Sequence, residues 1–311
     1  MTAPRAVYGK TLARLGETMD EIVVLDADLS KSTKTSYFAE AFPERFHDMG
    51  IAEQDMLSTA AGLATGGLTP FASTFAIFGT GRAWEQLRNS VCYPNLNVKL
   101  VATHGGITVG KDGGSHQSVE DLAVTRAIPN LRVIVPADCP ETEQAIEAIA
   151  REPGPFYVRL PRGDAPDVHP PEWRFELGRA TELRQGTDVA LVGCGLMVAV
   201  ALEAAAKLAE GGVSAAVVNV STLKPLDVDT LARVAAATGA VVTLEEHSII
   251  GGLGSAVCEA LGERCPVPVE RLGIADRFGQ SGTADELLAH YGLTVGDAVA
   301  RAEKVIARKA G

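Results

Sequence analysis

The stretch Val98–Gln117, VKLVATHGGITVGKDGGSHQ, is typical of a buried strand that opens directly into a ligand-binding loop. Val98–Ala102 is a mostly apolar run of strand length with one charged residue, Lys99, and the segment after it is dense in glycine. Glycine permits positive φ angles and a close approach of the backbone to a ligand. Because ligands of open α/β sheets bind beyond the carboxyl ends of the strands, Thr103–Gln117 is the first candidate for a site.

Outward from this stretch, short β-branched runs alternate with longer segments rich in Ala, Leu and Glu. The expected helices are 6–16, 54–66, 84–91, 139–151, 197–210 and 295–307; the expected strands are 22–25, 98–102, 131–135, 156–159, 189–192, 215–220, 240–244 and 267–272. This alternation predicts an α/β fold with mostly parallel sheets flanked by helices. Because 163–178 is proline-rich and aperiodic, we expect domains over 1–165 and 180–311, joined by a linker at 166–179.

Composition and charge exclude several classes of protein. The 311 residues carry a formal net charge of -11, which argues against a chain that binds a nucleic-acid backbone. The first ten residues lack the apolar core of a secretory signal, and no apolar run approaches the roughly 18 residues of a membrane span. Five scattered cysteines without a CxxC pair indicate reduced thiols, mostly in the core. We expect a cytoplasmic protein that binds neither nucleic acid nor a membrane.

The glycine-rich loop carries His104, Asp112 and His116. Two imidazoles and a carboxylate offer the donors and acceptors that a polyhydroxylated substrate needs. The alternative is a glycine-rich turn whose surface histidines have only local partners. The eleven residues between the two histidines fix no ligand geometry, so we expect no metal to be bound by this chain.

Three other places are candidates. Glu53 lies in GIAEQ, before a predicted apolar helix. It either stabilises the helix N-terminus through the helix dipole or acts as a buried acid that polarises a nitrogen heterocycle. Phe75 and Phe78, three residues apart, suit the core or a cofactor platform. Arg5 and Arg162 are possible anion forks, whereas Arg159, within a predicted strand, favours an internal ion pair.

Motifs of other enzyme classes are missing from the sequence. It contains no P-loop, no GxGxxG that opens a helix after a strand, and no nucleophile elbow. Gly251–Gly254 precedes a predicted helix, where a tight turn with close packing and anion binding by the helix N-terminus remain equal alternatives.

The ordered set of motifs resembles the C-terminal half of transketolase. The motifs are DADLS at 26–30, HDMGIAEQ at 47–54, ASTF at 72–75, HGGITVGKDGGSHQ at 104–117, RLPR at 159–162 and EEHSIIGGLGSAV at 245–257. The resemblance covers nearly the whole chain. It implies the pyrimidine-binding domain of a thiamine diphosphate enzyme, then a transketolase C-terminal domain. The implied reaction transfers a two-carbon ketol unit from a ketose phosphate to an aldose phosphate, in pentose phosphate metabolism.

The resemblance also implies a role for each candidate residue. Glu53 would hydrogen-bond N1′ of the aminopyrimidine ring, and the catalytic set would be Glu53, His104, Asp112 and His116. The cofactor set would be Asp28, Leu29, Ile51, Glu53, Phe75 and Phe78. The substrate set would be Arg5, Ser32, His104, Asp112 and Arg162. Two positions depart from the family: its next pocket aromatic falls near 79–81, and Lys111 stands where many members carry an acid.

One part of such an enzyme is missing. The family holds its Mg²⁺ (or Ca²⁺) and the diphosphate through a GDG-type motif of an N-terminal domain, and these 311 residues contain no Gly-Asp-Gly. The pyrimidine-binding part would begin near Arg5, which leaves no room for that domain. The resemblance therefore implies an N-terminal partner subunit with the diphosphate site, and an α₂β₂ assembly.

Three alternatives stay open. Deoxyxylulose-phosphate synthases usually carry Arg-Ala-Gly after the histidine, where this chain has Gly105-Gly106-Ile107. The β subunit of 2-oxoacid dehydrogenases has a similar length but lacks the His…Asp-Gly…His-Gln arrangement. A non-catalytic regulatory homologue would have no use for Glu53 together with His104, Asp112 and His116.

Overall fold

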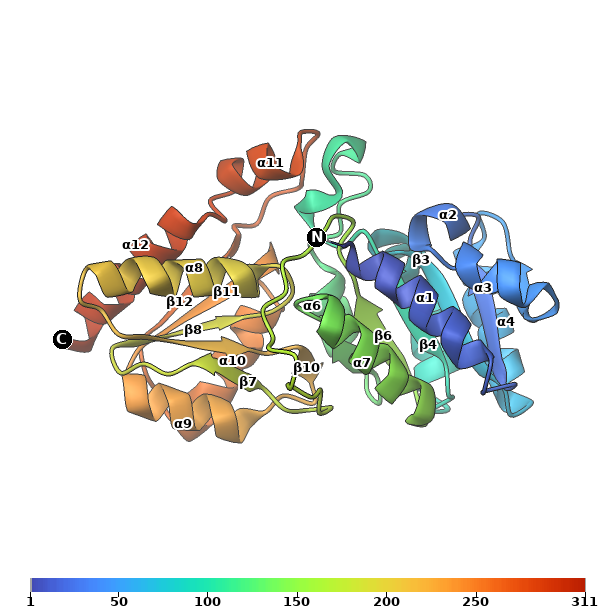
Figure 1. Cartoon of the computed structure of the whole chain (residues 1–311), viewed down its shortest axis with the longest axis horizontal. Coiled ribbons are helices and arrows are strands. Elements are labelled where there is room, and N and C mark those ends of the chain that lie inside the picture. The colour runs from blue at the N-terminus through green and yellow to red at the C-terminus, as the bar shows by residue number, and fades with distance from the viewer. Residues whose placement is uncertain (1, 311) are drawn as a thin grey trace.

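Two mostly parallel sheets organise residues 2–310, which are the residues that the computed structural model describes (Figure 1). The seven-stranded sheet has the order β10-β5-β6-β4-β3-β1-β2, and its one antiparallel pair is β10 with β5. Its strands are β1 (Ile22–Asp26), β2 (Phe46–Asp48), β3 (Thr69–Phe75), β4 (Lys99–Thr103), β5 (Arg132–Ile134), β6 (Phe156–Arg159) and β10 (Thr222–Lys224).

The five-stranded sheet has the order β12-β11-β8-β9-β7, and β7 is antiparallel to β9. Its strands are β7 (Thr181–Arg184), β8 (Val189–Gly193), β9 (Ala215–Asn219), β11 (Val241–Ser248) and β12 (Val269–Ile274). The predicted α/β fold with mostly parallel sheets flanked by helices is confirmed.

Helices cover both faces of the first sheet because its strands are apolar on both sides. In β1, Val24 packs into one core, whereas Val23 and Leu25 pack into the other. The first core lies beneath α1 (Pro4–Gly16), α3 (Ser36–Ala41) and α7 (Cys139–Arg151). The second lies beneath α4 (Glu53–Thr65) and α6 (Asp121–Arg126).

The second sheet is covered in the same way. Helices α8 (Met197–Glu210) and α12 (Val295–Ala307) pack together on one face, and α9 (Val228–Thr238) and α10 (Leu253–Arg264) pack on the other (Figure 1). The remaining short elements are α2 (Ser30–Thr33), η1 (Pro43–Arg45), η2 (Phe78–Arg82), α5 (Trp84–Gln86), η3 (Leu87–Cys92), η4 (Ile107–Asp112), α11 (Ala284–His290) and η5 (Arg308–Ala310).

Besides short elements that were not predicted, such as β2 and β7, three differences from the sequence prediction have a clear physical reason. Strand β3 went unpredicted because Pro70 and the hydroxyl residues of TPFASTF interrupt any apolar run. The predicted helix 84–91 is a short α-helical turn that continues as the π-helical segment η3. Strand β10 follows the predicted linker yet pairs with β5 of the first sheet, so one segment of 180–311 belongs to that sheet. The domain bounds themselves stay a prediction.

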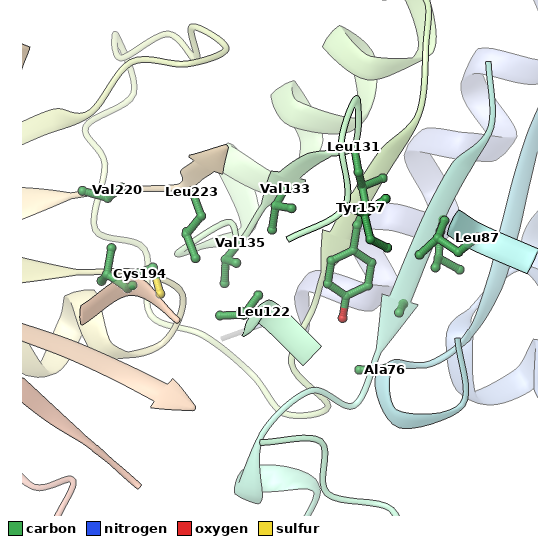
Figure 2. Close-up of a cluster of buried hydrophobic side chains, with 14 of the residues drawn as sticks. Ala76, Leu87, Leu122, Leu131, Val133, Val135, Tyr157, Cys194, Val220 and Leu223 are labelled. Atoms are coloured by element: carbon green, nitrogen blue, oxygen red, sulfur yellow. The ribbon is translucent and has the colours of Figure 1, made fainter. Parts of the chain in front are cut away.

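One apolar cluster runs from the first sheet into the second. Figure 2 shows Leu122, Val133 and Val135 facing Cys194 and Leu223, and all five side chains are buried. We call the seven-stranded sheet with its helices the first lobe and the five-stranded sheet with its helices the second lobe. Burial of a shared apolar surface fixes the position of the two lobes relative to each other. All five cysteines are free thiols, but only Cys92 and Cys194 are buried, so the prediction that most of them lie in the core is wrong. Within residues 2–310, no helix combines the length and the apolar character that crossing a membrane requires.

Candidate functional site

The strand order of the first sheet gathers the candidate residues at one edge. Strands β6, β4, β3, β1 and β2 are consecutive neighbours, and all of them are parallel. Their carboxyl ends therefore lie side by side, and the candidate residues end or follow them in the order Arg162, His104, Phe75, Asp28 and Glu53. Residues more than a hundred positions apart in sequence thus become neighbours.

Glu53 is the first residue of α4, where a carboxylate complements the helix dipole, and only 1% of it is exposed. Each of its two carboxylate oxygens lies 2.9 Å from Nη1 of Arg82. Arg82 ends η2, and 47% of its side chain is exposed. The sequence analysis missed Arg82, because no spacing rule links two residues that are 29 positions apart.

Aromatic rings connect the two predicted parts of the site. Phe75 and Phe78 stack with their ring centroids 5.9 Å apart, and the His104 ring lies against Phe75 at 3.8 Å. His116 meets Phe78 edge-on at 5.4 Å. The Arg82 guanidinium lies 4.6 Å from the centroid of Phe78. The expected cofactor platform and the histidines of the loop therefore form one cluster.

His104 is held in an unusual backbone conformation, with φ +60°. Its Nδ1 lies 2.8 Å from the Thr103 hydroxyl, and the side chain is buried. Burial, helped by the positive charges of Arg5 and Arg162, lowers the pKa of His104 to about 3. The ring is therefore neutral near pH 7 and offers one N–H donor and one acceptor.

An open pocket of about 590 Å³ lies beside the glycine-rich loop. Three cations, Arg5, Lys111 and Arg162, line it together with Asp164 and with residues 108–110 and 282–284. Arg5 donates from Nε to the Arg162 carbonyl at 2.8 Å and from Nη1 to the Ser32 carbonyl at 2.6 Å. Arg162 donates to the Val109 carbonyl and lies 3.7 Å from Asp112. The predicted anion-binding residues therefore come together, although Ser32 takes part through its backbone.

Asp28 and Leu29 lie in a turn that Asp26 shapes. Asp26 is buried and accepts hydrogen bonds from the Leu29 N–H at 2.6 Å and from the hydroxyls of Thr33 and Thr35. Burial raises the pKa of Asp26. Asp28 has φ +61° and donates its N–H to Asp48. This network holds the Asp28 and Leu29 backbone at the carboxyl end of β1.

The second lobe supports the glycine-rich loop, and α11 lies beside η4 (Figure 1). Gln117 donates from its side-chain amide to the carbonyls of Ile107, Gly110 and Gln280. Glu246 accepts from the Thr108 N–H at 2.7 Å. A Cβ on Gly106 would stand 2.2 Å from the Glu246 carboxylate, so the loop needs glycine there.

Two other features from the sequence analysis, Gly251–Gly254 and Arg159, have structural roles. Glu245 accepts from the N–H groups of Leu253 and Gly254, so the chain's own carboxylate occupies the N-terminus of α10. The tight-turn interpretation of Gly251–Gly254 is therefore right. Arg159 forms the expected internal ion pair, at 2.9 Å from the buried Asp121.

Ile51 is 75% exposed although it lies two residues before the buried Glu53. A single exposed apolar side chain is common at protein surfaces and marks no interface by itself. A group with metal-ligand chemistry is formed by Asp138 and Glu141 at the start of α7 and by His169 of the predicted linker. Its atoms already form hydrogen bonds with one another, with Asn219 and with backbone N–H groups.

Comparisons with known proteins agree along the chain. Residues 1–167 match the family model "Transketolase, pyrimidine binding domain", and residues 178–297 match "Transketolase, C-terminal domain". A putative transketolase C-terminal section of Methanocaldococcus jannaschii is 50% identical over 96% of this chain and 94% of that protein. A 6-deoxy-6-sulfo-D-fructose transketolase subunit of a Clostridium species is 43% identical over 98% of this chain and 95% of that protein.

A solved structure is similar over the whole chain. It is titled a split gene transketolase, inactive beta4 tetramer, and it is 54% identical with a TM-score of 0.93. The match covers 99% of this chain and 100% of that one. Deoxyxylulose-phosphate synthases match as well, but this chain covers less than half of their length.

Proposed function

This chain belongs to the transketolase family, and from that premise we propose that it works as the C-terminal subunit of a two-chain, thiamine diphosphate-dependent ketol transferase. The observation that carries the proposal is a buried carboxylate, Glu53, which Arg82 connects to a cluster of flat rings formed by Phe75, Phe78 and His104. The deoxyxylulose-phosphate synthase alternative is not favoured, because the relatives that match from end to end are transketolase sections.

The residues of this chain fit the aminopyrimidine half of the cofactor. Glu53 offers a buried acceptor for a ring nitrogen, and Phe75 and Phe78 offer aromatic faces beside it. Asp28 and Leu29 would flank the thiazolium side, and Ile51 would contact the cofactor from the apolar side. When bound, thiamine diphosphate supplies a nucleophilic carbon that adds to a ketose carbonyl. Glu53 would hold the proton exchanged at N1′.

The loop and the pocket suit a sugar phosphate. A neutral His104 donates and accepts one hydrogen bond each, and His116 and Asp112 add polar groups at the same loop. Arg5 and Arg162 would hold the terminal phosphate as bidentate forks, with the Ser32 segment beside them. Lys111 brings a third positive charge to this pocket.

We propose that a partner completes the site. The sequence contains no Gly-Asp-Gly, so an N-terminal transketolase subunit would hold Mg²⁺ (or Ca²⁺) and the diphosphate. The similar β-chain tetramer, whose title calls it inactive, supports a site that forms between chains in an α₂β₂ assembly.

Reconstitution tests the proposal. The chain, mixed with a GDG-containing chain from the same genome, should bind thiamine diphosphate with Mg²⁺ in calorimetry and transfer a ketol unit between sugar phosphates. Either chain alone should do neither. In the complex, Glu53→Gln should still bind the cofactor but lose on the order of 10²–10⁴ in turnover, the usual contribution of a positioned acid–base group.

Three outcomes would contradict the proposal. Tight Mg²⁺-dependent binding and full activity of this chain alone would remove the need for a partner. Near-wild-type turnover of the Glu53→Gln complex would remove Glu53 from the chemistry, and no transfer by the wild-type complex would favour a non-catalytic regulatory homologue.

A further inference from the structure

Arg82 occupies the Glu53 carboxylate, which is the group that the proposed function needs for cofactor binding. Both Glu53 oxygens accept from Arg82 Nη1 at 2.9 Å, and the Arg82 guanidinium also lies 4.6 Å from the Phe78 centroid. A flat, cationic hydrogen-bond donor thus makes two contacts at once: a bond to the buried carboxylate and a stack on an aromatic face. A bound aminopyrimidine ring would make the same two contacts.

Electrostatics explains why a partner stands there. Only 1% of the Glu53 side chain is exposed, and a buried carboxylate that loses its partner destabilises a protein strongly. Arg82 is therefore suited to compensate Glu53 in the absence of a ligand. A ring nitrogen that bonds to Glu53 could take over this compensation, whereas solvent cannot reach the carboxylate.

The local structure allows Arg82 to leave. Its side chain is 47% exposed, so the guanidinium can pass into water at modest cost. Its backbone carbonyl accepts from the Gln54 side-chain amide at 3.1 Å, which keeps the main chain in place. The Arg82 side chain can therefore move without a shift of α4 or η2.

We propose that Arg82 is a positioning residue of this site, which holds the Glu53 carboxylate and the Phe78 face until the aminopyrimidine ring replaces it. The inference rests on the proposed function, because it assigns the exchange to the ring that Glu53 would bind. Arg82 thereby keeps a buried acid ready without a ligand, and the cofactor must displace it to bind.

Cofactor binding to the reconstituted complex tests the proposal. Arg82→Gln should lower the melting temperature of the cofactor-free complex, because Glu53 is left unpaired. With thiamine diphosphate and Mg²⁺ bound, the melting temperature of the Arg82→Gln complex should come close to that of the cofactor-bound wild-type complex. The rise in melting temperature on cofactor binding should therefore be larger for Arg82→Gln than for the wild type. Calorimetry should show a Kd on the order of ten times lower, since no ion pair has to be broken. The Arg82→Lys complex, which keeps the positive charge, should have a Kd and a melting-temperature rise between those of the wild type and of Arg82→Gln.

The controls separate exchange from a general structural role. Arg88→Gln removes the same charge from an exposed side chain six residues away and should match the wild type in Kd and in melting-temperature rise. In a Glu53→Gln background, Arg82→Gln should change Kd less than about twofold, because the pair is already broken.

An unchanged Kd together with an unchanged melting-temperature rise for Arg82→Gln would overturn the inference. A higher Kd, which means weaker cofactor binding, would also overturn it. An equal effect of Arg82→Gln on Kd in the Glu53→Gln background would overturn the inference as well. A wild-type complex that binds no cofactor would contradict the proposed function itself, which distinguishes the two failures.

Discussion

Among single residues, Arg162 has the sharpest consequence for substrate choice. Its guanidinium lines the pocket together with Arg5, which donates a hydrogen bond to the Arg162 carbonyl. Burial, and then the nearby charge of Arg162, lowers the pKa of Arg5. Two guanidinium groups set close together are each disfavoured by the other, and a bound anion would relieve this repulsion.

Arg162→Ala should therefore raise KM for phosphorylated sugars much more than for their unphosphorylated counterparts, because alanine cannot replace a bidentate fork. Steady-state kinetics of the reconstituted complex with both substrate classes measures this. Arg174→Ala is the matched control, since Arg174 is exposed and bonds only to carbonyls of its own segment. Equal effects of Arg162→Ala on both classes would assign this arginine to structure.

At the scale of one element, the start of α7 ties the linker to both lobes. Asp138 caps this helix by accepting from the Glu141 N–H at 2.8 Å, and it also accepts from the N–H and Nδ1 of His169. Asn219 of β9 donates to Glu141 at 3.0 Å, and the His169 ring stacks on Trp173 at 3.9 Å. Although burial alone would raise the pKa of Asp138, these hydrogen bonds lower it.

Asp138→Asn should lower the free energy of unfolding at pH 7 by about 3 kcal/mol, since charged acceptor bonds are lost and an amide donor faces N–H groups. Because the folded-state pKa of Asp138 is lowered, its contribution is complete above the unfolded value of about 3.9 and is lost as the pH falls through the folded-state value. Urea unfolding from pH 7 down to about pH 2 should show the difference in unfolding free energy shrinking below about pH 3.9.

The exposed Asp20 provides the comparison for this variant, and Asp20→Asn should leave stability nearly unchanged at every pH. A pH-independent gap between Asp138→Asn and the wild type would mean that the carboxylate charge is not what stabilises the linker.

For the whole molecule, one buried ion pair lies where the two lobes meet. Arg159 of β6 lies 2.9 Å from Asp121 of α6 and donates to the Glu246 carbonyl of β11 at 2.8 Å. Tyr157 donates to the same Asp121 carboxylate at 2.6 Å. Burial alone would lower the pKa of Arg159, but Asp121 and Glu246 raise it, so the guanidinium stays charged.

Arg159→Met should lower the free energy of unfolding by about 3–5 kcal/mol, because it leaves the buried Asp121 without its ion-pair partner. Arg264→Met breaks an exposed pair with Asp229 at 2.8 Å and should cost only about 0–1 kcal/mol. Denaturant unfolding of both variants measures the difference. If the two variants lost the same small amount, the interface between the lobes would rest on its apolar cluster alone.

The sequence by itself determined the fold class and several elements to the residue. The helices predicted at 139–151, 197–210 and 295–307 match α7, α8 and α12, because apolar periodicity and capping are local properties. The motifs also pointed to Glu53, the glycine-rich loop and the pocket arginines. Their roles in catalysis and binding stay predictions.

Only the tertiary structure decided which distant groups meet. Strand β10 crosses into the first sheet, Asn219 reaches Glu141, and Arg82 pairs with Glu53 across 29 positions. None of these contacts leaves a periodic or spaced signal, since each depends on how whole elements pack. Packing fixes which side chains face one another in space, whereas a sequence pattern records only what neighbours along the chain have in common.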